Sequence, residues 1–264
     1  MKFDMHCHIK GGSIDSRVSL ERFIELLKEH NFDGMMISDH DSYRACKYWD
    51  RIKHRPEYKD FVVIKGIEYD TRDAGHFLVI MPDGVLLPVL TIRGMKLERL
   101  IRIVHHYGGI LGPAHPYGVR SSSAMLFKTL AIRPQMIREF DFIETFNTCE
   151  SHLSNVLAHK LAGKYGKIGT GGTDAHVEKY IGMAYTEIDA RITCNNDMIR
   201  AILEHRIVDA GGTEREASIK GKMKESIFGV AGFQIYNKGL GGVLTPYRNI
   251  KIRKMKEAEE YGQK

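Results

Sequence analysis

The chain has 264 residues, of which 43% are hydrophobic and 27% are charged, as is usual for one large α/β domain or two small ones. No apolar run reaches the ~18 residues of a membrane-spanning helix, and the charged N-terminus lacks the apolar segment of a secretory signal. The formal net charge of +6 is compatible with anionic substrates such as phosphates or nucleic acid, although it is also common in proteins that bind neither.

The pattern of apolar residues predicts strands that alternate with helices along the chain. Helices are indicated by apolar residues at helical spacing, and strands by short apolar or β-branched runs. Ser19 is the expected N-cap of the first helix. The predicted strands cover residues 2–7, 33–38, 61–69, 75–81, 108–116, 140–146, 167–176 and 207–212. The predicted helices cover residues 19–31, 42–55, 97–107, 150–166 and 196–206.

This alternation predicts βα units and an α/β fold with a largely parallel sheet. Repetition of the unit without a linker favours a barrel over an open sheet, although periodicity alone does not prove closure. Past about residue 215 the pattern weakens into a glycine-rich stretch and a charged, helix-like end. We therefore expect one barrel domain over residues 1–215. A basic C-terminal extension over residues 216–264 is expected to pack on or beside it.

Histidines and carboxylates recur where the predicted strands end. Residues i and i+2 of a strand face the same way, so His6 and His8 should point to one side. Asp174 and His176 repeat this spacing after a later strand. The other residues that follow apolar runs in this way are His40, Glu68, His115 and Glu144.

The strand ends of a parallel α/β barrel meet on one rim, where the functional loops lie. Imidazole and carboxylate groups are ligands of Zn²⁺, Mn²⁺ and Fe²⁺, and their number on this rim exceeds what one ion needs. Holding so many polar and charged groups together without a metal would be costly. The sequence therefore predicts two or three divalent ions at the rim.

Each motif has a simpler interpretation when it stands alone. The pair His6 and His8 is a weak signal, and Asp41 or Ser42 could cap a helix. Glu68 could be a solvated strand end, and the glycine-rich segment before Asp174 lacks the lysine of a phosphate-binding loop. The joint placement of these motifs at successive strand ends is hard to explain if their residues are only solvated surface residues. Histidines on predicted helices are interpreted as structural or solvated, namely His30, His54, His105, His106, His152, His159 and His205.

The cysteines give no sign of a disulfide framework. Cys7, Cys46, Cys149 and Cys194 are scattered along the chain without a C-x-x-C pair. A reducing cytoplasm is therefore the expected location. Neither Cys7 nor Cys149 has the local sequence of a catalytic thiol.

Several motifs occur in an order that resembles a known family. The motifs are DMHCH, ISDHD, GIE, GH before an apolar strand, AHP and GTDAH. Together, over roughly residues 3–190, they resemble the PHP (polymerase and histidinol phosphatase) phosphoesterases. The resemblance implies a distorted (β/α)7 barrel that holds two or three divalent ions (Zn, Mn or Fe) at the strand ends.

The resemblance also implies three overlapping sets of metal ligands. The first set would be His6, His8, Glu68 and Asp174. The second would be Glu68, as a bridging ligand, with His76 and His115. The third would be Asp15, His40 and His176. His76 is identified by the resemblance alone, and Asp15 lies in a first loop longer than the family's commonest form.

The predicted chemistry is metal-assisted hydrolysis of a phosphoester by a bridging hydroxide, because clustered divalent ions lower the pKa of a water that they share. Asp174 is the predicted proton acceptor, by analogy with related metallohydrolase barrels. A cation near the rim should hold the phosphate oxygens. Arg120, which follows His115, is the best placed, and Arg17 and Arg72 are further candidates.

The substrate is left open by the sequence. The basic charge and lysine-rich tail fit a nucleotide or an oligonucleotide end. The absence of an interleaved aromatic and basic pattern makes a small phosphomonoester equally compatible. Two other functions stay open, a PHP module that binds metal in a regulatory or structural role and a hydrolase of a non-phosphate bond. No membrane partner is expected, and the sequence fixes neither the native metal nor the oligomeric state.

Overall fold

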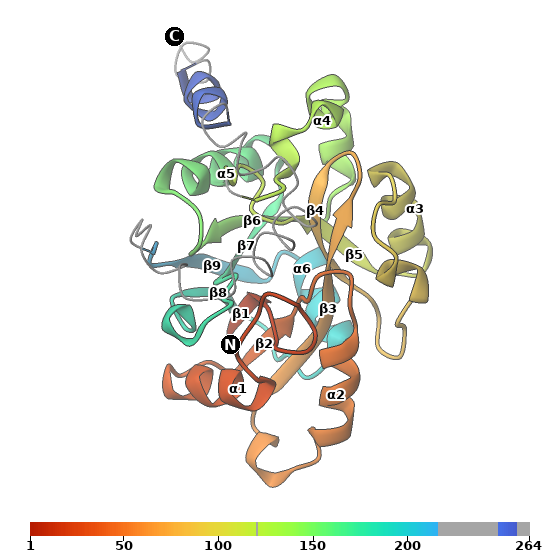
Figure 1. The fold of residues 1–264 in the computed structure, drawn as a ribbon, viewed down its shortest axis with the longest axis vertical. Helices are drawn as coiled ribbons and strands as arrows, with labels where there is room; N and C mark the ends of the chain where they lie inside the picture. The colour runs from red at the N-terminus through yellow and green to blue at the C-terminus, as the bar shows by residue number, and fades with distance from the viewer. Residues whose placement is uncertain (120, 216–247, 258–264) are drawn as a thin grey trace.

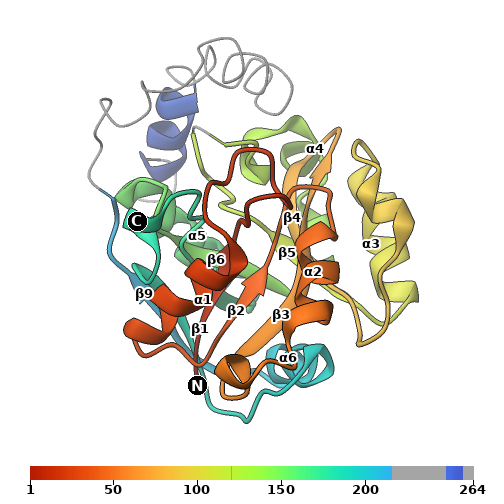
Figure 2. The ribbon, with the colours of Figure 1, turned by 60° about the horizontal axis from the view of Figure 1, so that its bottom comes forward.

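A computed structural model describes residues 1–119, 121–215 and 248–257 of the chain (Figure 1). Within these residues the fold is mixed α/β, with a curled sheet and helices packed around it (Figures 1 and 2). No helix of the described residues is long and apolar enough to cross a membrane. Residues 216–247 and 258–264 of the expected C-terminal extension lie outside the described residues.

One sheet contains seven strands in the order β5-β4-β3-β2-β1-β8-β9, and β6 and β7 form a separate pair. The strands are β1 (Lys2–Cys7), β2 (Gly34–Ile37), β3 (Val62–Thr71), β4 (Gly75–Ile80), β5 (Ile110–Pro113), β6 (Phe142–Asn147), β7 (Ile168–Gly172), β8 (Ala184–Ile188) and β9 (Ile207–Gly212). The α-helices are α1 (Leu20–Glu29), α2 (Arg44–Ile52), α3 (Leu97–His106), α4 (Lys128–Ile132), α5 (His152–Tyr165) and α6 (Asn195–Leu203). Residues 248–257 form a further helix.

The β6–β7 pair connects two strands of the large sheet. On one side, the backbone N–H of Asp141 donates to the carbonyl of Leu111 in β5 over 2.9 Å. On the other side, Cys7 of β1 forms an isolated parallel bridge with Ala175. The sheet therefore curls round a common interior through a few hydrogen bonds and not through a continuous ladder. This arrangement agrees with the predicted α/β class.

The strand directions differ from the largely parallel sheet that the sequence suggests. Parallel pairing joins β1 to β2, β2 to β3 and β6 to β7. Antiparallel pairing joins β3 to β4, β4 to β5, β1 to β8 and β8 to β9. The short connection at residues 72–74 explains the direction of β4, because a parallel crossover needs a dozen or more residues. As a result, the beginning of β4 lies beside the end of β3, and His76 pairs with Asp70.

The helices cover the outside of the sheet with one apolar face each. In α1 the buried residues are Leu20, Phe23, Ile24 and Leu27, spaced as on one side of a helix. The predicted N-cap of α1 is confirmed, because the hydroxyl of Ser19 accepts from the backbone N–H of Arg22 over 3.3 Å. Figure 2 shows α1, α2 and α3 outside strands β1 to β5.

The close approach of β7 to β1 gives a first prediction. A Cβ atom at Gly172 would lie 2.3 Å from Cβ and 2.6 Å from the backbone nitrogen of His6, so the two strands would have to separate. We expect Gly172→Ala to destabilise the fold by about 1–3 kcal/mol, as overpacking does. Urea unfolding measures this change.

A second glycine of the same chain supplies the control for that measurement. Gly163 lies in α5, and a Cβ atom there would meet no other atom within 4 Å. Gly163→Ala should therefore stabilise the fold by up to about 1 kcal/mol, because alanine favours a helix over glycine. An unfolding midpoint of Gly172→Ala equal to that of the wild type would contradict the tight contact of β7 with β1.

Candidate metal centre

The side chains that the sequence places at the strand ends converge at one end of the curled sheet. They come from β1, from the end of β3, from the beginning of β4 and from the loops between the elements. The structure brings together His6, His8, Asp15, His40, Glu68, His76, His115, Asp174 and His176. We call these side chains the histidine cluster.

Glu68 lies in the middle of the histidine cluster, and its side chain is only 1% exposed. Its Oε1 atom lies 2.9 Å from Nδ1 of His76 and 3.0 Å from Nε2 of His115. Its Oε2 atom lies 2.9 Å from Nδ1 of His40, 3.3 Å from Nε2 of His8 and 3.5 Å from Nε2 of His6. One carboxylate thus contacts imidazoles of all three predicted ligand sets, as is expected of a bridging ligand.

Two aspartates extend the histidine cluster toward the first loop. The Oδ1 atom of Asp174 lies 3.2 Å from Nε2 of His8 and 3.6 Å from Nδ1 of His176. The Oδ2 atom of Asp15 lies 3.1 Å from Nε2 of His176 and 3.8 Å from Nε2 of His40. The first loop therefore brings Asp15 to the pair of histidines with which the resemblance groups it.

A β-bulge aims His6 and His8 into the site. Between Asp4 and Cys7 the register of β1 against β2 shifts, so that β1 contains one extra residue. Before the bulge, Phe3 and Met5 pack together in one core cluster. After it, Cys7 packs in the other cluster. The bulge therefore changes which residues of β1 point inward and turns both histidines toward Glu68.

Groups outside the histidine cluster fix the orientation of its rings. A metal-binding histidine commonly uses its second ring nitrogen in such a contact, which sets the tautomer and the direction of the ring. The contacts are His6 Nδ1 to Glu144 Oε1 (2.9 Å), His8 Nδ1 to Ser13 Oγ (3.0 Å), His115 Nδ1 to Ser123 Oγ (3.2 Å) and His176 Nδ1 to the carbonyl of Asp174 (2.9 Å).

Sequence reasoning did not find Ser13 and Ser123, and it gave Glu144 no role. Lone serines in loops follow no strand-end pattern, so no signal distinguished them. Glu144 did stand at a predicted strand end. In the structure it contacts His6, and its Oε2 atom accepts from the backbone N–H of His115 over 2.5 Å. It therefore supports two members of the histidine cluster from behind.

The donor atoms fit divalent metal ions. Several buried atoms lie close to charged groups without forming a hydrogen bond among the described residues, including Oε2 of Glu68, Nδ1 of His76 and Nε2 of His176. Divalent cations between such atoms would supply the bonds that the hydrogen-bond geometry does not. The groups whose donor atoms lie within 4.8 Å of one another are His8 with His40 and His176, His6 with His8 and Glu68, His6 with His115 and Asp174, and His40 with Glu68 and His76.

The charges of the cluster are coupled in the metal-free protein. Burial alone would raise the pKa of Glu68, but His76, His40 and His6 together hold that pKa well below its usual range. Burial alone would lower the pKa of His6, but Glu144, Asp174 and Glu68 hold it well above its usual value. Without metal, the protonated form of His6 and the ionised form of Glu68 are therefore favoured together.

These shifts predict that metal binding releases protons at pH 7. Ligand imidazoles must be neutral, and the pKa values of His6, His8, His115 and His176 are raised above the usual value of 6.5. Because a raised pKa keeps the proton on the ring to higher pH, apparent metal affinity should rise with pH through 6.5 and above. Calorimetric titration with Zn²⁺ in two buffers of different ionisation enthalpy counts the protons.

A histidine outside the cluster provides the control. The pKa of His105 is also raised, chiefly by its hydrogen bond to Asp141, but His105 lies on α3. His105→Asn should leave the number of released protons unchanged. Metal binding by the wild type without proton release would contradict the charge state inferred for the cluster.

The predicted phosphate-binding arginines are only partly placed. Arg17 is exposed, and its backbone N–H donates to the carbonyl of His176 over 3.1 Å, so this residue borders the cluster. Arg72 is exposed in the β3–β4 connection. Arg120 lies outside the described residues.

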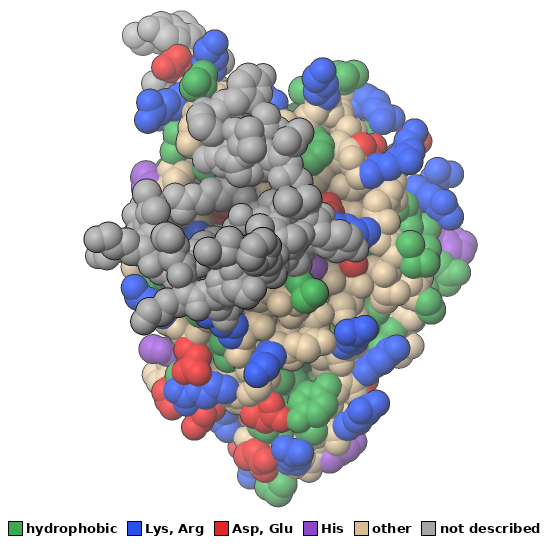
Figure 3. Space-filling view, in the orientation of Figure 1, with side chains coloured by type: hydrophobic (Ala, Val, Ile, Leu, Met, Phe, Trp, Pro, Cys, Tyr) green, Lys and Arg blue, Asp and Glu red, His purple; other side chains and the backbone are tan. Residues whose placement is uncertain are grey.

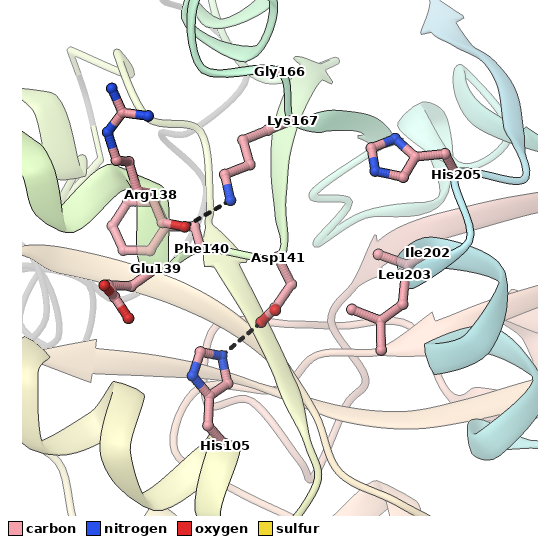
Figure 4. Close-up of a pocket in the computed structure, with 10 residues that line it drawn as sticks. All are labelled: His105, Arg138, Glu139, Phe140, Asp141, Gly166, Lys167, Ile202, Leu203 and His205. Carbon is pink, nitrogen blue, oxygen red and sulfur yellow. Dashed lines mark hydrogen bonds and ion pairs between the residues drawn. The ribbon is translucent and has the colours of Figure 1, made fainter.

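A separate hollow of about 290 Å³ lies away from the histidine cluster (Figure 4). Its lining residues precede β6, β7 and β9, at the ends of these strands opposite to the cluster. There His105 pairs with Asp141 at 2.9 Å, and Nζ of Lys167 donates to the carbonyl of Arg138 over 2.7 Å (Figure 4). These cations already have partners, and the hollow contains none of the candidate metal ligands.

Comparison with known proteins adds one family model and several solved structures. A model described as PHP-associated matches residues 152–207. No curated protein matches the chain.

Among the solved structures, PsfC from Pseudomonas syringae PB-5123 is 16% identical with a TM-score of 0.59, over 90% of this chain and 98% of that protein. A protein from Bifidobacterium adolescentis, assigned as a metal-dependent phosphoesterase, is 13% identical with a TM-score of 0.54, over 78% of this chain and 96% of that protein. The lesion-specific endonuclease PfuEndoQ from Pyrococcus furiosus is 18% identical with a TM-score of 0.55, over 80% of this chain and 59% of that protein. At these identities the likeness concerns the fold.

Proposed function

We propose, from the PHP-type fold of the chain and its PHP-associated segment, that this protein is a metal-dependent phosphoesterase. Its substrate would be a phosphomonoester or a nucleotide or oligonucleotide phosphoester. The observation that carries the proposal is the buried carboxylate of Glu68, whose two oxygens lie within 3.5 Å of five imidazoles. Imidazole and carboxylate groups gathered in this way form the donor set of a divalent metal site, whereas a structural ion pair needs only one cationic partner.

Two or three divalent ions (Zn, Mn or Fe) would be held by the histidine cluster. His6, His8, Glu68 and Asp174 would hold the first ion, and Glu68, His76 and His115 the second. Asp15, His40 and His176 would hold the third. When bound, such ions supply Lewis acidity toward the phosphate and lower the pKa of a water at the site.

Asp174 is the residue proposed to accept the proton of the attacking water. Its side chain is 10% exposed, against 1% for Glu68, so its carboxylate is the one of these two that can pass a proton outward. Its pKa is held well below the usual range, because His6, His8 and His176 outweigh the effect of burial. Asp174 is therefore ionised throughout the neutral range, as a proton acceptor must be.

Cations on the surface would assist the approach of an anionic substrate. Arg17 borders the histidine cluster, as its backbone contact with His176 requires. Figure 3 shows further Lys and Arg side chains around α3 and α4 on one face of the molecule. The exposed basic residues of these helices and their flanks are Lys96, Arg99, Arg102, Lys128 and Arg133. Such a face raises the local concentration of phosphorylated molecules.

Metal analysis combined with a substrate panel tests the proposal. The panel contains phosphomonoesters, phosphodiesters, nucleoside 3′,5′-bisphosphates and amides, each tried with the metal-loaded and the chelator-stripped protein. We expect turnover of one phosphoester class that disappears on stripping and returns with added metal.

Other results of the same panel would contradict the proposal. Full phosphoesterase activity after stripping would remove the metal from the mechanism. Metal binding without turnover of any compound would favour a regulatory or structural role. Turnover of amides alone would favour hydrolysis of a non-phosphate bond.

A further inference from the structure

The helix of residues 248–257 docks beside the histidine cluster. Nη1 of Arg248 donates to the carbonyl of Ser121 over 2.9 Å, and Nζ of Lys251 donates to the carbonyl of Leu126 over 3.2 Å. Ile252 is 1% exposed in the main hydrophobic core. Because residues i, i+3 and i+4 share one face of a helix, Arg248, Lys251 and Ile252 act together as its docking face.

The segment Ser121–Ser123, which this helix contacts, holds two members of the histidine cluster. The carbonyl of Ser122 accepts from the backbone N–H of His76 over 2.8 Å. The hydroxyl of Ser123, which is fully buried, lies 3.2 Å from Nδ1 of His115. Both imidazoles contact Oε1 of Glu68. A displacement of this segment would therefore move His76 and His115 together.

Tight packing leaves the segment little freedom to adjust by itself. A Cβ atom at Gly75, directly before His76, would lie 2.3 Å from the carbonyl oxygen of Ser122. The hydroxyl of Ser121 donates to Oε1 of the buried Glu150 over 2.9 Å. Arg248 is partly buried, which lowers the pKa of its guanidinium, and the nearby carboxylate of Glu150 opposes this effect. The guanidinium is thus held by a buried environment and is not a freely solvated surface charge.

We propose that Arg248 and Lys251 are positioning residues of the metal centre. By holding the backbone at Ser121 and Leu126, they fix the segment that orients His76 and His115 toward Glu68. This role goes beyond phosphoester hydrolysis itself and rests on the proposed metal centre. It gives the described part of the C-terminal region a function in the site and not only in the packing of the fold.

The full-length double variant Arg248→Met with Lys251→Met tests this role. Its metal affinity is measured by competition with a chelator, the geometry of its site by the absorption spectrum of bound Co²⁺, and the protection of the His76 amide by hydrogen exchange. We expect the most weakly held ion to bind about 10–100-fold less tightly, as on loss of groups that orient metal ligands. The Co²⁺ spectrum should change, and the His76 amide should exchange faster.

The matched control is Arg253→Met with Lys254→Met on the same helix. Both residues are exposed, and the change removes the same charge. Loss of two positive charges would by itself strengthen the binding of a divalent cation, so weaker binding only in the first variant indicates lost positioning. Arg248→Lys with Lys251→Arg should recover most of the affinity, since both side chains still donate.

The outcomes separate this inference from the proposed function. Wild-type affinity, spectrum and His76 protection in the Arg248 and Lys251 variant would overturn the positioning role and leave the phosphoesterase proposal intact. A wild-type protein that binds no divalent ion would overturn the proposed function itself. Should the double variant fail to fold, Arg248→Met alone carries the same measurements, and the same results decide.

Discussion

Glu68→Gln is expected to abolish hydrolysis and to lower the content of bound metal while leaving the chain folded. Glutamine keeps the shape of the side chain but removes the charge that lies within 3.5 Å of imidazoles on both sides of the site. Loss of such a central group should reduce kcat by about 10³-fold or more. Steady-state kinetics, metal analysis and urea unfolding of the purified variant measure the three effects.

Glu178→Gln provides the matched control. Glu178 is 55% exposed, and its carboxylate pairs with Arg22 of α1 at 3.1 Å. An exposed ion pair of this kind contributes little, so activity and metal content should equal those of the wild type. A Glu68→Gln variant that keeps the wild-type metal content and rate would show that Glu68 is not the bridging ligand.

Strand-end spacing was sufficient to predict most of the histidine cluster. The pairs His6 with His8 and Asp174 with His176 rest on the two-residue period of a strand, and both pairs contact one another in the structure. The resemblance to the PHP phosphoesterases and the PHP-type α/β fold are confirmed. The local periodicity of a strand indicates which face each side chain lies on. The α/β fold class then predicts that side chains at the strand ends meet at one end of the sheet.

Strand-end spacing does not predict the position of His76. It is the second residue of β4 and not the last residue of a strand. The strand-end rule assumes parallel strands, but β4 runs antiparallel to β3, so its beginning lies at the rim. Only the length of the β3–β4 connection carries this information, because three residues cannot form a crossover. Weighing that length would have predicted both the strand direction and the place of His76.

The β-bulge in β1 was also not predicted from the sequence. Simple alternation from Phe3 and Met5 would send Cys7 to their side of the strand and His6 to the other. In the structure, one extra residue in β1 interrupts this alternation. Cys7 therefore packs in a different core cluster from Phe3 and Met5, and His6 faces Glu68. Bulges commonly re-aim side chains next to functional sites. The position of a bulge depends on the register between two paired strands. The sequence of one strand does not determine that register.

Support from outside the cluster was the hardest part to predict. Ser13, Ser123 and Arg248 act through hydrogen bonds from a loop or a distant helix. Their positions depend on tertiary packing between segments that are far apart in the sequence. The division into a barrel over residues 1–215 and an extension over 216–264 stays a prediction. Within it, the burial of Ile252 shows that the described helix of the extension packs into the core.

Asp174→Asn is expected to lower kcat by about 10²–10⁴-fold, the range for loss of a general base, while retaining more metal than Glu68→Gln. Asp174 has a φ of 51°, and asparagine tolerates this left-handed conformation, so the backbone should stay in place. The amide oxygen can still contact a metal but no longer accepts a proton. Kinetics and metal analysis together distinguish the two roles.

The pH dependence of this variant sharpens the test. The pKa of Asp174 is held well below its usual range, whereas the pKa values of His6 and His8 are raised. As pH falls, the imidazoles therefore take up protons and release metal before Asp174 is protonated. The acid limb of kcat should lie at the same pH in the wild type and in Asp174→Asn, with a lower plateau in the variant. A shift of that limb, or metal loss as complete as in Glu68→Gln, would show that Asp174 acts only as a ligand and not as the proton acceptor.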